Sequence, residues 1–192
     1  MGSEVEMSNA REHILQTTRD LMEKQGYHGT GLNEIVKESG ASKGSLYHYF
    51  PEGKEQITSE AVLQSGKATA ERIQNGLIGN KNAAKAIHDF VFNIADHVES
   101  SGFAAGSPLT AVAMETATKS ERINSACREA YILLETAFKE KLLESGFTKS
   151  KAEELGTFIT AAVEGGIILS RTYHSGNPLR TVAKYLKVLL SQ

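Results

Sequence analysis

The stretch LYHYF, at residues 46–50, places five large side chains in a row. In a buried helix the apolar residues recur every three or four positions with polar residues between them, so these five cannot all face a core. Leu46 and Phe50 lie four apart and share one helix face, which suits a core pair. The rest of the helix surface then belongs to three polar rings: Tyr47, His48 and Tyr49. Outward phenol and imidazole groups can hydrogen-bond to the phosphates and bases of a nucleic acid.

The residues before this stretch predict the helices that position it. The apolar pattern predicts a first helix over residues 10–25, closed by Gly26 as a left-handed cap, and a second helix over residues 32–39. Ser42 is a good N-cap for a third helix over residues 43–49. Two short helices joined by a tight turn are typical of the helix-turn-helix, whose second helix enters the DNA major groove. Such pairs also occur in purely structural bundles, so both interpretations stay open at this point.

Small and polar side chains begin the third helix, and a cation follows it. Lys43, Gly44 and Ser45 occupy its first turn, where small side chains let the backbone approach base edges and an ammonium or hydroxyl can reach them. Pro51 ends the helix. Lys54 then opens a fourth helix, whose positive N-terminus suits a phosphate. The segment therefore predicts contacts with both bases and phosphates.

The charge of the chain argues against strong non-specific attraction to DNA. The 192 residues carry a formal net charge of −2, and residues 1–54 contain six Lys and Arg against eight Asp and Glu, which again gives −2. Non-specific binding depends on neutralising phosphates, so it should be weak here. We expect operator-specific binding by a homodimer, which places two recognition helices one helical turn of DNA apart, roughly 34–36 Å.

The segment from Ile14 to Lys54 resembles the DNA-binding domain of the TetR family, the tetracycline-repressor-like transcription regulators of bacteria. The matching landmarks are Gly26-Tyr27, Ile35, Gly40, Lys43-Gly44-Ser45, Leu46-Tyr47, Phe50 and Lys54. The resemblance implies that residues 1–54 form a three-helix, helix-turn-helix DNA-binding domain. Residues 55–192 would then form a helical domain for effector binding and dimerisation. In the family pattern Tyr47 and Lys54 grip phosphates, while four residues approach bases: Lys43, Gly44, Ser45 and Tyr49.

The chain departs from the family pattern at two places. Gly31 stands where a capping Ser or Thr is common, so Thr30 is expected to substitute for it. The turn before Lys54 is one residue longer than usual, a feature that resembles the LmrA/YxaF-type branch of the family. The complete set expected at double-stranded DNA is Thr30, Ser42, Lys43, Gly44, Ser45, Tyr47, His48, Tyr49 and Lys54.

The chain after residue 54 also has a helical pattern, and an all-α fold follows. The expected helices cover residues 54–78, 83–98, 109–118, 121–144, 150–173 and 178–190. The last two carry apolar residues on more than one face, so they must be buried on more than one side. The resemblance implies that they form a four-helix dimer interface with a partner copy through Phe158, Ala162, Gly165, Gly166, Leu169, Val182, Leu186 and Leu189. Packing within one subunit would give the same pattern, so that alternative stays open.

In the resembled family the second domain contains a cavity for a small effector, whose binding changes the separation of the recognition helices. The candidate lining residues are Phe90, Ile94, His97, Phe103, Met114, Glu115, Phe138 and Phe158. Their composition favours an apolar or aromatic effector, although an ordinary core has the same composition. His97 equally fits a surface position at a helix end, and Glu115 equally fits a solvated carboxylate or a partner of Arg122.

The sequence carries no recognisable catalytic or metal motif. It lacks the HExxH, GxSxG and phosphate-loop patterns and its six His are scattered, so we expect no enzyme, no metal and no cofactor. Cys127, paired with a distant His, is the basis for a remote alternative, an α-helical enzyme.

The leading hypothesis is a dimeric repressor that a small effector releases from a palindromic operator. The alternative is a helical, dimeric ligand-binding protein that does not bind DNA. The single Cys and the acidic, polar N-terminus indicate the cytoplasm, and the apolar runs are too short to predict a membrane span.

Overall fold

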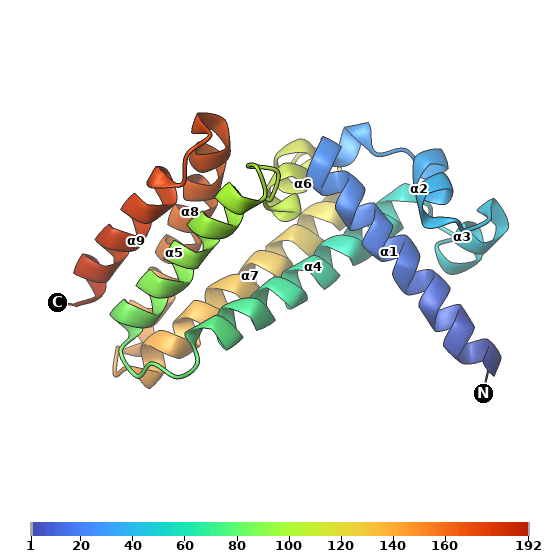
Figure 1. The fold of residues 1–192 in the computed structure, drawn as a ribbon. Coiled ribbons are helices and arrows are strands. Elements are labelled where there is room, and N and C mark those ends of the chain that lie inside the picture. Colours follow the sequence, from blue (N-terminus) through green and yellow to red (C-terminus); the bar gives the residue numbers. More distant parts are fainter. Residues whose placement is uncertain (1, 192) are drawn as a thin grey trace. The chain divides into compact units, whose positions relative to one another are not determined.

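Helices account for all the regular structure of residues 2–191, the part of the chain that the computed structural model describes (Figure 1). Nine α-helices lie in this range: α1 (Gly2–Gly29), α2 (Leu32–Ser39), α3 (Lys43–Tyr49), α4 (Lys54–Leu77), α5 (Ala83–Ser100), α6 (Pro108–Thr116), α7 (Glu121–Glu144), α8 (Lys149–Tyr173) and α9 (Asn177–Leu190). The predicted all-α fold is confirmed. None of the helices in this range combines the length and the apolar character that crossing a membrane requires.

The two helices of the helix-turn-helix, α2 and α3, lie where the sequence predicts them. Gly40 ends α2 with a left-handed conformation, φ 67°, and its N–H bonds to the carbonyl of Lys37. Ser42 caps α3, because its Oγ accepts the N–H of Ser45 at 3.0 Å. This bond satisfies one of the N–H groups that the first turn of a helix leaves without a partner.

The regular helix of α1 is interrupted where the sequence predicts its end. Gly26 has φ 72° and ψ −178°, which is not helical, and a short helical stretch up to Gly29 follows this kink within α1. Essentially only glycine adopts this combination, so Gly26 breaks the helix as predicted, with an extended ψ in place of the left-handed cap conformation. We refer to residues 26–30, which connect α1 to α2, as the 26–30 corner.

Packing divides the chain into two compact units. Unit 1 consists of the residues up to 66 together with residues 108–130, and unit 2 consists of residues 67–107 and the residues from 131 onward. Helix α6 and the beginning of α7 therefore belong to the same unit as the helix-turn-helix, although they are far from it in the sequence, and α6 packs against α1. The predicted division at residue 54 concerns DNA and effector binding, and it stays a prediction.

The core of unit 1 fixes the orientation of α3. Leu46 and Phe50 are both fully buried, which confirms the predicted core pair. They join buried residues from α1, α2 and α4: Ile14, Leu15, Leu21, Ile35, Ile57 and Ala61. Truncating a buried Phe to Ala typically costs about 3–5 kcal/mol. Anchors of this strength determine which face of α3 points outward.

In unit 2 a cluster of ion pairs joins α9 to α5. The Arg180 guanidinium donates to Glu99 at 2.6 and 2.9 Å and to Asp96 at 2.7 Å. It also lies over the Phe92 ring, 5.3 Å from the ring centroid. Glu99 accepts a further bond from the N–H of Gly176 at 2.7 Å. The bonds from Arg180 and Gly176 favour the ionised carboxylate and lower the pKa of Glu99 to about 2.

Replacing Glu99 by Gln is expected to lower the thermal unfolding temperature at neutral pH and to matter less in acid. The folded-state pKa of Glu99 lies below its ordinary value of 4.5, so the ionised group stabilises the fold above that value. This stabilisation is lost as the pH falls toward the folded-state pKa. The difference in unfolding temperature between the parent and Glu99→Gln should therefore shrink from about pH 5 to about pH 3.

Glu154→Gln is the matched control for this measurement. Glu154 pairs with Lys151 on the exposed surface of α8, at 3.5 Å. Exposed pairs of this kind contribute little stability, so little change in the unfolding temperature is expected at either pH. A Glu99→Gln penalty that stays the same across the pH range would contradict the assignment.

Candidate nucleic-acid interface

The outward face of α3 presents groups that can bond to DNA. Lys43, Gly44 and His48 are exposed, and Tyr47 keeps 52% of its surface accessible. The ammonium, imidazole and phenol groups can reach phosphates or base edges, and Gly44 leaves room for close approach of the backbone. The outward orientation predicted for Tyr47 and His48 is confirmed. Their contacts with DNA stay a prediction.

Tyr49 is less outward than predicted. It is half-buried and packs against the core of unit 1. Its ring meets His48 edge-on at 5.2 Å and Phe50 at 6.4 Å between centroids. Position 49 follows Leu46 by three residues and so shares part of the buried helix face. Tyr49 therefore supports the position of α3 in addition to its predicted approach to a base.

Ser42 and Ser45 bond to each other at the start of α3. Their Oγ atoms lie 2.9 Å apart, in addition to the capping bond from the N–H of Ser45. A hydroxyl has one donor and two acceptor sites, so both side chains keep further bonding capacity. The cap therefore fixes the orientation of both serine side chains before any contact with DNA is made.

The prediction for Thr30 is corrected by the structure. Its side chain is fully buried, and its Oγ1 donates to the carbonyl of Gly26 at 2.8 Å. Helix α2 begins after Gly31 without a side-chain cap, so Thr30 does not replace the missing capping hydroxyl. The hydroxyl instead closes the 26–30 corner by joining its last residue to its first.

Lys54 lies at the first position of α4 and is already engaged within the protein. Its Nζ donates to the carbonyl of Tyr27 at 2.6 Å and lies 4.1 Å from the centroid of the Tyr27 ring. Burial lowers the pKa of Lys54, and the negative charge of Glu115 opposes this change. The ammonium is thus held beside the 26–30 corner. If it contacts a phosphate as predicted, it does so from this position.

Two arginines outside the motif support the turn that follows α3. Arg122 from α7 pairs with Glu52 and donates from Nε to Ser59 Oγ at 3.2 Å. Arg11 from α1 lies over the Phe50 ring, 5.2 Å from its centroid. Sequence reasoning missed both anchors. The longer turn that carries Glu52 was the one signal for an additional contact here.

The predicted effector residues are divided between the two units. Met114 and Glu115 belong to unit 1, while the other six belong to unit 2. Met114 is 78% exposed and Phe158 53% exposed, so both lie on the surface. Phe90 and Phe138 meet edge-to-face with 6.2 Å between centroids, as in a packed core.

The other residues predicted to line the effector site either contact different residues or are exposed to solvent. Phe103 stacks on His174 with 5.2 Å between ring centroids. His97 is exposed in the last turn of α5, which favours the helix-end alternative, and Ile94 is half-buried. Glu115 accepts the N–H of His28 at 2.7 Å, so the suggested pairing with Arg122 is replaced by a backbone contact.

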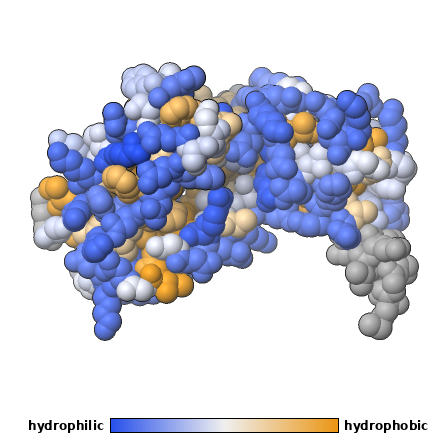
Figure 2. Space-filling model, viewed as in Figure 1, coloured by the Kyte–Doolittle hydropathy of each residue, from blue (hydrophilic) through white to orange (hydrophobic). Residues whose placement is uncertain are grey.

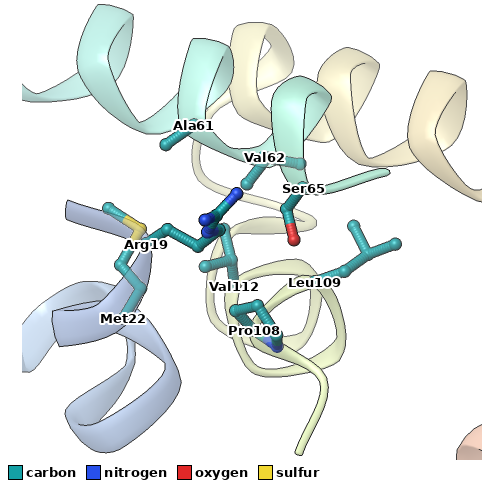
Figure 3. Close-up of a pocket in the computed structure, with 8 residues that line it drawn as sticks. All are labelled: Arg19, Met22, Ala61, Val62, Ser65, Pro108, Leu109 and Val112. Carbon is teal, nitrogen blue, oxygen red and sulfur yellow. The ribbon is translucent and has the colours of Figure 1, made fainter. Parts of the chain in front are cut away.

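A small hollow lies elsewhere, within unit 1 (Figure 3). Its cavity volume is about 10 Å³, roughly the room that one water molecule occupies. Its lining residues are Arg19, Met22, Ala61, Val62, Ser65, Pro108, Leu109 and Val112. Ligand pockets usually span about 300–1,000 Å³, and none of the predicted effector residues lines this one. The hollow therefore does not fit the predicted effector site.

Helices α8 and α9 leave apolar side chains exposed. We refer to these residues as the α8–α9 apolar strip: Phe158, Ile168, Leu169 and Tyr173 on α8, and Tyr185, Val188 and Leu189 on α9. Figure 2 shows hydrophobic residues at the surface beside the C-terminal end of α9. Three of these residues, Phe158, Leu169 and Leu189, were predicted at a dimer interface. The other four were missed because buried and exposed apolar residues cannot be told apart from the sequence.

The structure corrects other members of the predicted interface. Leu186 is 2% exposed, and a Cβ added at Gly166 would lie 2.9 Å from a methyl group of Leu179. Both therefore pack within the subunit, as the alternative interpretation proposed. Gly165 faces open space, while Ala162 and Val182 are half-buried.

Two family models match the chain. Residues 14–61 match the model described as bacterial regulatory proteins, tetR family. Residues 83–185, more than half of the chain, match the model described as transcriptional regulator LmrA/YxaF-like, C-terminal domain. The resemblance inferred from the helix-turn-helix residues, including the branch inferred from the longer turn, is confirmed.

Curated relatives and solved structures agree with these matches. The HTH-type transcriptional regulator YxaF of Bacillus subtilis is 42% identical, over 95% of this chain and 95% of that protein. The HTH-type transcriptional regulator LmrA of the same species is 38% identical, over 96% and 98%. The crystal structure of reduced NemR from E. coli has a TM-score of 0.80 at 21% identity, over 93% of this chain and 95% of that chain. At that identity the last comparison shows the fold alone.

Replacing Ser42 by Ala is expected to destabilise the protein by about 1 kcal/mol, because the N–H of Ser45 loses its acceptor. Urea unfolding of the full chain measures the difference. Ser42→Asn keeps a capping oxygen and serves as the control, with stability close to the parent. Equal stability of the Ala variant and the parent would show that the cap contributes nothing.

Proposed function

Because this chain belongs to the TetR family of bacterial transcriptional regulators, we propose that it represses transcription by binding an inverted-repeat DNA operator with the outward face of α3. The observation that carries the proposal is the set of exposed polar groups on a short helix whose orientation is fixed by a buried pair. Lys43 and Tyr47 are outward, while Leu46 and Phe50 lie in the core. A small effector releases the protein from the operator.

The charges near α3 favour selective binding over general attraction to DNA. The helix-turn-helix segment is net acidic, but several of its carboxylates already have partners within unit 1. Glu52 pairs with Arg122, Glu38 pairs with Lys37 at 3.4 Å, and Glu34 accepts a bond from Gln25 at 2.7 Å. These partners reduce the repulsion of phosphates without creating a basic surface. Few phosphate contacts imply a shallow fall in affinity as the salt concentration rises.

Two copies of the chain bind the two half-sites of the operator. The α8–α9 apolar strip is the surface that fits this role, because large apolar side chains exposed on two helices that pack together are typical of a protein interface. A two-fold dimer uses the same patch on both subunits. Four helices, α8 and α9 from each copy, would then bury the strip. Two recognition helices related by this two-fold axis match an inverted repeat.

The effector remains defined by chemical class only. Sequence composition favours an apolar or aromatic molecule bound by residues 55–192. Effector binding would act by favouring a conformation that fits the operator less well. DNA as the partner implies a cytoplasmic location. A change in the anisotropy of labelled operator upon addition of a compound identifies an effector directly.

Selection from random duplex DNA tests the operator proposal. The parent chain is expected to enrich an inverted repeat, and Tyr47→Ala is expected to lose that enrichment because the exposed ring no longer reaches the backbone. With the selected operator, Lys43→Ala should weaken binding by roughly 1–3 kcal/mol and relax the choice of base at one position in each half-site. Anisotropy titrations with matched and single-mismatch duplexes measure both effects.

Lys67→Ala is the control for the loss of one positive charge. Lys67 is exposed on α4, outside the helix-turn-helix. Its removal changes the net charge as Lys43→Ala does and should leave operator affinity close to the parent value. If the parent enriched no sequence while a compound bound to it tightly, the alternative of a ligand-binding protein without DNA binding would be favoured.

Placing a carboxylate in the α8–α9 apolar strip should dissociate the dimer. Leu169 is 45% exposed, so Leu169→Glu is tolerated by the free subunit but buries a charge in the dimer. Sedimentation is expected to show monomers of native helical content that bind the operator at least tenfold more weakly. Leu143→Glu, at a position 40% exposed on α7, is the control and should stay dimeric. If the Leu169→Glu variant stayed dimeric, the dimer interface would have to lie outside the α8–α9 apolar strip.

A further inference from the structure

The carboxylate of Glu115, at the end of α6, is docked onto the 26–30 corner. Its Oε2 accepts the backbone N–H of His28 at 2.7 Å, a contact between residues 87 positions apart. Its Oε1 occupies the space in which a side chain at Gly26 would begin, so that a Cβ added there would overlap it. Gly26 thus serves two purposes at once, since it supplies the unusual backbone conformation and leaves room for the carboxylate.

The corner is also held by Lys54 and by its own last residue, Thr30. Lys54 donates to the carbonyl of Tyr27 at 2.6 Å, and Thr30 Oγ1 donates to the carbonyl of Gly26 at 2.8 Å. Lys54 begins α4 and Thr30 precedes α2. The corner is therefore bonded to the start of α4 and leads directly into α2. A shift of the corner would displace Lys54 with it.

The charges around the corner complement one another. The negative charge of Glu115 acts favourably on the ammonium of Lys54. Lys119, just beyond α6, places its Nζ 3.1 Å from Nε2 of His28. Glu115 is therefore a partly buried carboxylate with a backbone donor and neighbouring cations, an arrangement in which a hydrogen bond to a charged group stabilises more than a neutral one.

We propose that Glu115 is a positioning residue for DNA binding: by holding the 26–30 corner, it sets the position of Lys54 and of the start of α2 for contact with the operator. The inference rests on the proposed operator binding. It places a determinant of DNA affinity on α6, outside the segment that matches the family's DNA-binding model. The carboxylate itself does not touch DNA and acts through the backbone of His28.

The test compares Glu115→Ala and Glu115→Gln with the parent, as full-length chains on the operator selected by the parent. Glu115→Ala is expected to lose roughly tenfold or more in operator affinity, because the corner loses its charged acceptor. Glu115→Gln keeps an oxygen that can accept the N–H of His28 and should recover much of that loss. The recovery separates support of the corner from charge, since both variants remove the same negative charge.

A second readout follows the corner without DNA. Hydrogen exchange of the His28 amide should become faster in Glu115→Ala and stay slow in Glu115→Gln. Urea unfolding shows whether either variant loses global stability. If Glu115→Ala folds poorly, operator affinity and His28 exchange are still compared between Glu115→Gln and the parent. Glu121→Ala is the charge-matched control, because Glu121 is an exposed carboxylate of the same unit, paired with Arg128 at 2.6 Å.

The outcomes distinguish this inference from the proposed function. A parent chain that selects no operator would overturn the proposal of operator binding. A parent that binds, together with a Glu115→Ala variant of equal affinity and unchanged His28 exchange, would overturn the positioning role alone. Loss of affinity in Glu115→Ala with recovery in Glu115→Gln, and no change in Glu121→Ala, would establish it.

Discussion

A recognition helix of seven residues is too short to be stable alone, so contacts from the rest of unit 1 must stabilise it. Helices of fewer than about 12–15 residues are marginal in water, so α3 depends on contacts from outside itself. Leu46 supplies buried area in the middle of α3 and Phe50 does so at its C-terminal end, while Ser42 satisfies its first turn. The stacking of Arg11 on Phe50 and the pairing of Arg122 with Glu52 then fix the chain where it leaves the helix.

The same constraint explains why polar rings crowd a segment that must also be anchored. Seven residues cover less than two full turns, so each anchoring position removes a position from the outward face. Tyr49 shows the compromise, because its ring packs partly on the core while the adjacent His48 is exposed. The consecutive large residues of the sequence are therefore the signature of a helix that uses one narrow face for folding and the remainder for recognition.

Local signals made much of this fold predictable. The Ser42 cap, Gly40 at the end of α2 and the spacing of Leu46 and Phe50 each depend on neighbours in the sequence, and the structure confirms them. The errors concern residues whose role depends on distant segments. The residues around the buried Thr30 resemble those around an exposed threonine, and the residues around the exposed Phe158 resemble those around a buried phenylalanine. Their burial is decided by which helices pack against them.

Contacts from α6 and α7 are the clearest example of what periodicity cannot reveal. An apolar stripe predicts that a helix is buried, but it does not say which carboxylate meets which backbone N–H across 87 positions. The sequence left a pairing of Glu115 with Arg122 open as one alternative. In the structure Glu115 contacts the 26–30 corner, while Arg122 contacts the turn that carries Glu52. The two turns that flank α2 and α3 are thereby supported by a segment that follows them by more than fifty residues. The operator-binding unit is consequently defined by packing, and a contiguous stretch of sequence contains only part of it.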